Sequence, residues 1–170
     1  MALVSTSQVV TDQSATPVVK TNPLEKGGRV RTAQGFLLAA SYTGGTVGQW
    51  YTFIRLPKRA RVLGVFLSQA TTTTGAVKVG LYRPDGIAID DDIFSAITVL
   101  GAATNIRARV DTQTVYTAAL RQSALEDAFS VAIGTAGATN DVEFDIAAAI
   151  VTVIGTPTDA LLEVDYVLDE

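Results

Sequence analysis

The chain contains neither cysteine nor histidine. Without cysteine it can form no disulfide and no thiolate zinc site, and without histidine it lacks the commonest general base and the commonest metal ligand. A Ser-His-Asp triad cannot be assembled. Any catalysis would fall to carboxylates, lysine, tyrosine or the hydroxyl residues, so we expect no enzyme, no cofactor and no bound metal.

Charge is also scarce. Only 18% of the residues are charged, below the roughly 25% that is usual in soluble domains, whereas 48% are hydrophobic. Much of the polar surface must then come from threonine, serine, glutamine and asparagine. A surface poor in long charged side chains loses less side-chain entropy when it is covered, so it suits burial in an assembly.

Long apolar segments are missing as well. The longest runs from Ile146 to Ile154 and is interrupted by Thr152, which is too short to cross a bilayer. The sequence from Met1 to Ser7 lacks the basic start and apolar core of a signal peptide. We therefore expect no membrane contact and synthesis in a cytoplasm.

The charges that are present lie unevenly. Residues 1–110 carry twelve lysines and arginines against six acidic residues, whereas residues 111–170 carry one against eleven. This asymmetry favours pairing between the two parts inside one fold, with head-to-tail contact between copies as the alternative. The net charge of −4 disfavours direct binding of nucleic acid.

Residues 1–30 are rich in serine, threonine, glutamine, valine and proline, without sustained apolar periodicity, and end near the turn signal Lys26-Gly27-Gly28. We interpret them as an extended N-terminal arm. Residues 31–170 form the predicted folded domain.

That domain carries short runs of strand-forming residues between breakers. A reversal is predicted at Arg83-Pro84-Asp85-Gly86. The predicted strands are Trp50–Leu56, Arg61–Ser68, Val77–Tyr82, Ile87–Asp90, Phe129–Ile133, the second half of Ile146–Ile154, and Ala160–Leu168. Helical spacing predicts one short helix at Ala118–Phe129 and a second near Asp92–Ile97. Together these favour a mainly β domain, a single β-sandwich or jelly-roll-like fold with one or two short helices.

Two carboxylate clusters stand out. Asp90-Asp91-Asp92 has oxygen atoms suited to a hard cation but not the alternating ligand spacing of a calcium loop, so a solvated turn or helix cap is favoured. Asp141, Glu143 and Asp145 would line one face of a strand, which requires water, a cation or basic partners. Paired catalytic acids would need two different environments, for which the sequence offers no sign.

A basic cluster follows a group of aromatic residues. We expect Trp50 and Ile54 to share one face in contact with the core, and the basic side chains to serve protein contact or solvation in preference to single-stranded nucleic acid. Our candidate interface residues are the basic cluster and the valine pairs of the arm: Arg55, Lys58, Arg59, Arg61, Val9, Val10, Val18 and Val19.

The stretch Phe53–Leu67, with Leu56-Pro57 and Arg61-Val62, is followed by a Thr/Gly loop and Val79-Gly80-Leu81-Tyr82, and the chain ends in Val164-Asp-Tyr-Val-Leu168. This pattern resembles small virion proteins of tailed bacteriophages, which are commonly encoded beside the major capsid protein. The resemblance implies a head decoration or cement protein on the outer surface of the capsid. Its implied partners are the major capsid protein and further copies of itself, as a dimer or trimer, with the arm extended over neighbouring subunits.

Other functions remain open at this point. A neck, tail or head-fibre-base component would have the same general character. A carbohydrate- or receptor-binding sandwich would need exposed aromatic residues, for which Tyr42, Trp50 and Tyr51 are candidates. A carboxylate-dependent hydrolase would need two of the clustered acids to converge in one pocket.

Overall fold

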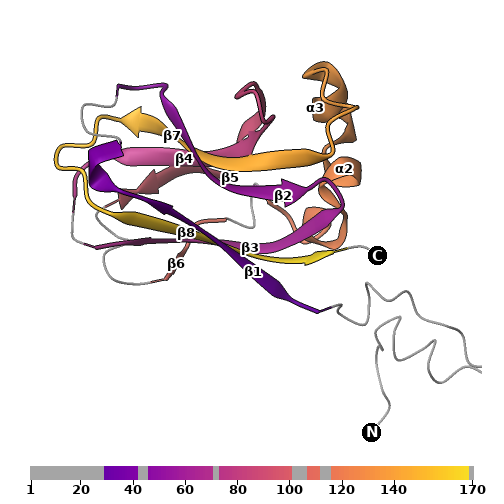
Figure 1. Cartoon of the computed structure of the whole chain (residues 1–170), viewed down its shortest axis with the longest axis horizontal. Coiled ribbons are helices and arrows are strands. Elements are labelled where there is room, and N and C mark those ends of the chain that lie inside the picture. The colour runs from indigo at the N-terminus through magenta and orange to yellow at the C-terminus, as the bar shows by residue number, and fades with distance from the viewer. Residues whose placement is uncertain (1–28, 42–45, 71–72, 101–106, 112–115, 169–170) are drawn as a thin grey trace, which may run out of the picture.

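The computed structural model describes residues 29–41, 46–70, 73–100, 107–111 and 116–168. They form two four-stranded antiparallel sheets that pack face to face (Figure 1). Sheet A has the order β1 (Arg31–Leu37), β8 (Ala160–Leu168), β3 (Ala60–Gln69) and β6 (Ala108–Arg109). Sheet B has the order β2 (Trp50–Pro57), β7 (Glu143–Thr152), β4 (Ala76–Tyr82) and β5 (Ala88–Val99). The prediction of a mainly β sandwich is confirmed.

The first described strand pairs with the last, the second with the second to last, and so on toward the middle of the chain. β1 pairs with β8, β2 with β7, β3 with β6 and β4 with β5, in each case antiparallel. The chain is thus arranged as one long hairpin rolled so that alternate pairs fall into opposite sheets. The extra pairings of β3 with β8 and of β4 with β7 close each sheet.

The core lies between the sheets because side chains alternate along each strand. On β7, Phe144, Ile146 and Ile150 point inward and are at most 2% exposed. Val65 and Leu67 of β3 meet them from sheet A and are equally buried. Burial of this kind contributes about 1.5–3 kcal/mol for each large apolar side chain.

A bulge in β2 overturns one prediction. The register with β7 shifts between Thr52 and Ile54, so the alternation reverses across Phe53. Ile54 is 4% exposed and belongs to the core, whereas Trp50 is 40% exposed and lies on the outer face of sheet B. The expectation that both share one core-facing side was therefore wrong.

Helices are few in the described residues: η1 (Ala39–Ser41), η3 (Leu120–Gln122), α2 (Leu125–Ala128) and α3 (Ser130–Thr135). The predicted helix at 118–129 is thus broken into η3 and α2. The predicted strand at 129–133 is wrong, because Leu125, Phe129 and Ile133 are all buried at helical spacing.

The predicted helix at 92–97 is also wrong, because β5 continues as a strand to Val99 and pairs with β4. Tertiary pairing here overrides local propensity. β7 begins at Glu143 and ends at Thr152, earlier at both ends than the predicted strand in 146–154. The described part of the chain contains no helix long and apolar enough to span a bilayer.

The predicted arm, with Val9, Val10, Val18 and Val19, lies outside the described residues, as does Tyr42. The first described residues, Arg29 and Val30, are exposed and lead into β1. The division into an arm at 1–30 and a domain at 31–170 therefore stays a prediction.

Candidate functional site

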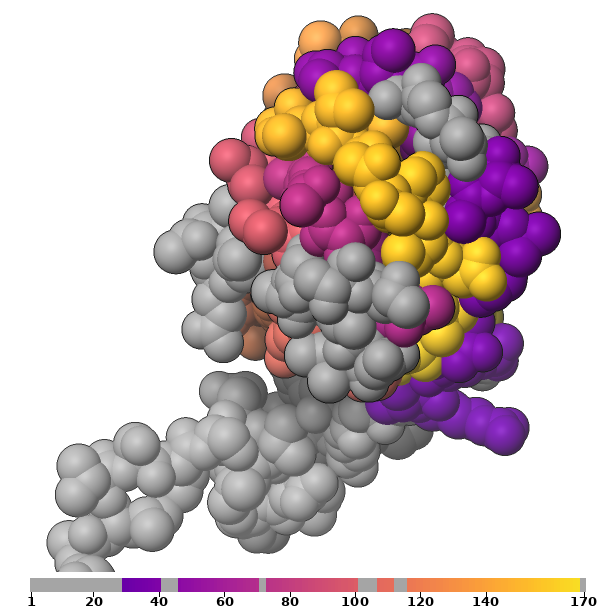
Figure 2. Space-filling model, turned by 90° about the vertical axis from the view of Figure 1, so that its left-hand side faces the viewer, coloured from indigo at the N-terminus to yellow at the C-terminus, as the bar shows by residue number. Residues whose placement is uncertain are grey.

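The two ends of the sandwich differ in chemistry. We call one the apolar end; its described residues are 36–40, 46–49, 68–70, 73–76, 97–100 and 152–160. Asp159 is the one charged residue among them, and its carboxylate accepts a hydrogen bond from the Ala39 amide at 2.9 Å. Figure 2 looks onto this end, where the gold atoms of the β7–β8 segment run beside indigo atoms of the N-terminal strands.

The apolar end exposes large hydrophobic side chains from four separate segments. Each is more than half exposed: Phe36 63%, Leu38 53%, Val47 61%, Ile97 63%, Val99 60% and Val153 57%. Single exposed apolar residues are common, but six at one end of the sandwich, where the residues defined above include one charge, make this end a candidate interaction surface. The sequence analysis missed this surface, because its residues come from strand ends that lie far apart in the chain.

Side-chain and main-chain hydrogen bonds hold the segments of the apolar end together. The Thr73 hydroxyl donates to the Thr156 carbonyl, which ties the segment before β4 to the β7–β8 connection. The Ala70 amide donates to the Asp159 carbonyl at 3.0 Å, and the Leu100 amide to the Gly75 carbonyl at 3.1 Å. The exposed side chains thus stand on a fixed backbone, which reduces the entropy lost on docking.

The basic cluster lies at the opposite end. Lys58 and Arg59 occupy the β2–β3 turn, and both pair with Glu126 of α2, at 2.9 and 3.6 Å. Arg61, on β3, is only 7% exposed. Lys58 and Arg61 are therefore engaged largely within the chain, whereas the Arg59 side chain is 68% exposed.

Arg55 lies on the outer face of sheet B beside Asp145. Its Nε and Nη2 donate to the two carboxylate oxygens at 2.6 and 3.0 Å. Asp145 is 2% exposed and Arg55 is about half exposed. The hydrogen bond to Asp145 is the main cause that raises the pKa of Arg55, so the cation is retained at any working pH.

The ion pair of Arg55 with Asp145 and several others join the basic first part of the sequence to its acidic last part. Arg83 pairs with Asp141 at 2.8 Å, and Arg107 pairs with Glu163 and Asp165 at 3.1 and 2.8 Å. The preference for pairing within one fold is thus supported by the geometry. Asp141 and Asp145 find basic partners, as their spacing required.

The Asp90–Asp92 group lies within β5. Asp91 pairs with Lys78 of the neighbouring strand, and Asp92 is exposed. Burial, followed by the neighbouring Asp92, raises the pKa of Asp90. The described residues contain no cluster of three or more acidic side chains arranged to hold a metal ion.

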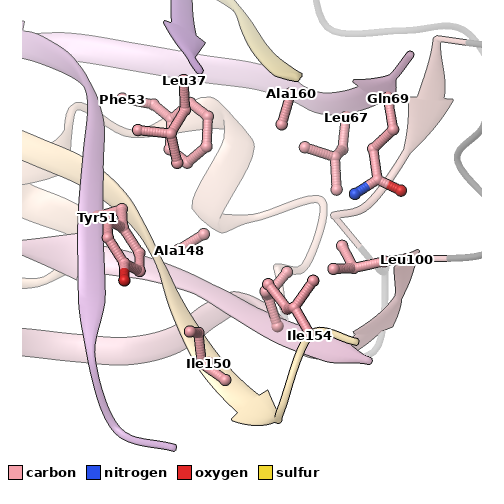
Figure 3. A pocket seen from close by; sticks show the side chains of 11 residues that line it. Leu37, Tyr51, Phe53, Leu67, Gln69, Leu100, Ala148, Ile150, Ile154 and Ala160 are labelled. Carbon is pink, nitrogen blue, oxygen red and sulfur yellow. The ribbon is translucent and has the colours of Figure 1, made fainter. Parts of the chain in front are cut away.

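Trp50, the first candidate for a sugar platform, lies on the outer face of sheet B and is 40% exposed, although it also makes a contact within the fold. Its ring stacks on Tyr82 with centroids 5.7 Å apart and 21° between the planes. Gly86 packs against it so closely that an added Cβ would lie 2.1 Å from the Trp50 ring. Tyr51 points toward the space between the sheets, so the two side chains form no common exposed platform (Figure 3).

The outer face of sheet A is covered by a polar network. The Arg107 guanidinium lies 3.5 Å from the centre of the Phe66 ring while it bonds Glu163 and Asp165. On the other side of β8, Thr32 donates to Asp165 at 2.7 Å. Salt bridges on open sheet faces add little stability, but this network leaves few free charges for a partner.

Comparison with known proteins gives a match in fold. No known family model matches the chain, and no curated protein sequence does. A chain in the capsid of Ralstonia phage GP4 superimposes with a TM-score of 0.57 at 13% identity, covering 84% of this chain and 86% of that one. Two further matches come from the cyanophage Pam1 capsid asymmetric unit (TM-score 0.47, 16% identity, 84% and 87% covered) and the capsid of Helicobacter pylori bacteriophage KHP30 (0.42, 15%, 83% and 89%).

Proposed function

We propose that this chain is a virion structural protein of a tailed bacteriophage, and specifically a capsid decoration or cement protein on the outside of the head. The observation that carries the proposal is the fold shared with a chain of the Ralstonia phage GP4 capsid over most of both lengths. A match at this identity concerns the fold. The function is our inference from that fold and from the surface of this chain.

The topology supports the same class. Pairing of strand one with eight, two with seven, three with six and four with five is the arrangement of a jelly roll, in which two sheets arise from one rolled hairpin. Viral capsid domains are among the proteins that use this fold, and lectin domains are others. Trp50 is 40% exposed, but Tyr51 points between the sheets, so the two form no shared aromatic platform that would support the lectin alternative.

The apolar end is the proposed docking surface. It combines six exposed hydrophobic side chains with a single, already bonded carboxylate. Its proposed partner is the major capsid protein, with further copies of this chain, as a dimer or trimer, as the second contact. In this proposal residues 1–30 form an arm that extends over neighbouring subunits.

The effect proposed for this protein, stabilisation of the capsid, follows from mass action. A protein that binds only the assembled lattice stabilises that lattice by its binding free energy. Many copies on one shell add their contributions, so each contact can be individually weak. An uncharged docking surface also makes the contact insensitive to salt, because little Coulomb attraction is screened.

The experiment is electron cryo-microscopy of particles from the source of this sequence, combined with rebinding of purified protein. We expect density on the outer lattice with the apolar end facing the shell. Val99→Lys and Val153→Lys should each reduce cosedimentation with depleted particles at least tenfold, since each places a charge in an apolar contact. Val131→Lys is the matched control, because Val131 is 83% exposed on α3.

Other results would redirect the proposal. Density confined to a vertex or the tail would assign the chain to a neck, tail or head-fibre-base component. Equal binding of the Val99, Val153 and Val131 variants would reject the apolar end as the docking surface. Absence from all particles would reject the virion role.

A further inference from the structure

Each of the two sheets has two edge strands, and three of the four edges carry features that discourage pairing with a further strand. β6 is only two residues long. β2 contains the bulge at Phe53 and ends at Pro57. β5 has three register shifts against β4 and carries Asp90, Asp91 and Asp92. Short length, bulges, proline and charge are the usual means by which proteins protect an edge.

The edge of β1 lacks these protections. Its seven residues pair with β8 without a register shift, and they contain no proline and one charge, Arg31, at the first position. Pairing with β8 uses the main-chain groups on one side of β1, so those on the other side are left over. Within the described part of the chain these groups have no hydrogen-bond partner. Such an edge is a template for one more strand.

The sequence before β1 contains a stretch suited to this edge. Residues 2–11 include no proline, no glycine and no charged residue, and they are rich in valine and threonine, which favour strands. The remainder is less suitable, because Pro17, Pro23, Gly27 and Gly28 interrupt it. Residues 2–11 are therefore the best candidate for an added strand.

The connection between this stretch and β1 is long enough to reach a second copy. Residues 12–28 can span about 60 Å when extended, whereas a domain of this size is about 35–40 Å across. Pro17 and Pro23 favour an extended backbone in the residues before them. A strand that returns to its own neighbour in a hairpin is usually joined by a loop of only about two to five residues. A neighbouring copy is therefore the favoured recipient.

We propose that residues 2–11 of a neighbouring copy pair with the free edge of β1 and form a fifth strand of sheet A. The inference rests on the arm of the proposed function and gives that arm a specific contact. Main-chain hydrogen bonds supply the affinity of such a contact, and alternate side chains fix its register.

The direction of the added strand follows from the position of β1. β1 begins at the end of the sandwich opposite the apolar end (Figure 1). Copies that dock on one shell through their apolar ends present their β1 strands in the same direction. An arm then leaves its own domain and enters the neighbouring one from the same end, so the added strand runs antiparallel to β1.

Disulfide crosslinking tests the contact, because the chain has no cysteine of its own. Full-length Gln34→Cys, at an exposed position of β1, is mixed with tagged full-length variants that each carry one cysteine at a position from 4 to 10, and the mixture is oxidised. Opposite residues of paired strands lie close enough for a disulfide. We expect mixed dimers whose yield alternates with a period of two along the arm.

The control target is Gln122→Cys, the same substitution at an exposed position of η3. It should give mixed dimers in several-fold lower yield and without alternation. Thr32→Cys, two residues earlier in β1, tests the direction. With this target the position of highest yield should move two residues toward the C-terminal end of the arm, as antiparallel pairing requires.

The mixtures are oxidised both in free solution and on particles. Yields no higher than with Gln122→Cys in both settings would overturn the proposal, as would a yield without alternation. Closure within single chains of a variant with both cysteines, without mixed dimers, would assign the edge to the chain's own arm and equally overturn it. Crosslinking in solution without particle binding would reject the proposed virion function alone. Particle binding without crosslinking would reject the arm contact alone.

Discussion

The guanidinium of Arg121 bonds the buried carboxylate of Asp111 and, through the same Nη1, the main-chain carbonyl of Leu63 at 2.7 Å. Leu63 lies at the bulge of β3, where the register with β8 shifts between Val62 and Gly64. Arg109 donates to the same carbonyl at 3.0 Å. A carbonyl that a bulge removes from the sheet ladder is thus satisfied by side chains.

We therefore expect Asp111→Ala to destabilise the protein by about 3–5 kcal/mol, because it leaves the largely buried Arg121 uncompensated and the Val65 amide without its acceptor. The measurement is urea denaturation at neutral pH. Asp127→Ala, which removes an exposed carboxylate in α2, should change the stability by no more than about 0.5 kcal/mol. Equal losses in both variants would contradict the role of Asp111.

A pH effect is expected at Asp165. Burial opposes its ionisation, but hydrogen bonds from Arg107 and Thr32 outweigh burial, so the pKa of Asp165 is lowered. A lowered pKa in the folded state contributes stability that is complete above the unfolded value of about 3.9 and is lost as the pH falls through the folded value. Below about pH 4 the wild type should thus lose stability more steeply than Asp165→Asn.

The measurement for Asp165 is the urea midpoint at a series of pH values. Asp127→Asn is the control for the removal of one acidic charge, and its profile should follow that of the wild type. Parallel profiles for wild type and Asp165→Asn below about pH 4 would show that the network of Arg107 and Thr32 does not act on this carboxylate.

Two glycines make a matched pair. A Cβ on Gly35 of β1 would lie 2.1 Å from the Phe53 carbonyl oxygen of β2, whereas one on Gly134 of α3 would meet nothing within 4 Å. We expect Gly35→Ala to cost at least about 1–3 kcal/mol, because the backbones must separate. Gly134→Ala should stabilise by about 0.5–1 kcal/mol, as alanine favours a helix. Thermal denaturation of both variants tests this difference, and a gain in both would contradict it.

Trp50 offers an optical test, since it is the one tryptophan in the chain. Gly86 has a φ of 90° and touches the Trp50 ring. We expect Gly86→Ala to displace the ring from Tyr82 and shift its fluorescence to longer wavelength. Gly48→Ala has a similar φ of 89° without any neighbour within 4 Å, so it should lower the stability without shifting the emission. An unchanged spectrum in Gly86→Ala would count against the stacking.

The sequence allowed the class of fold and several central strands to be predicted, because alternation and breakers such as Pro57 are local signals. The last strand, Ala160–Leu168, was found with its bounds. β1 was missed, since Arg31 to Leu37 shows no clean alternation and is held by pairing with β8. The bulge at Phe53 could not be predicted, because it depends on the register of two strands that lie about ninety residues apart.

Less of the candidate site than of the fold could be predicted from the sequence. Basic residues such as Lys58 attract attention in a sequence, but their partners, such as Glu126, become visible only in the fold. The apolar end is made of single residues such as Phe36, Val99 and Val153. None of them belongs to a sequence motif in its own segment.

The pairing of β8 between β1 and β3 also governs when the chain can fold. Sheet A acquires one of its two inner strands from residues 160–168, which are synthesised after all the other described strands. Until then β1 has no neighbour to accept its hydrogen bonds, and folding is dominated by contacts of long sequence separation, which form slowly. The sandwich therefore cannot close before residues 160–168 have been synthesised. A nascent chain that stalls shortly before Ala160 would be a substrate for chaperones and proteases.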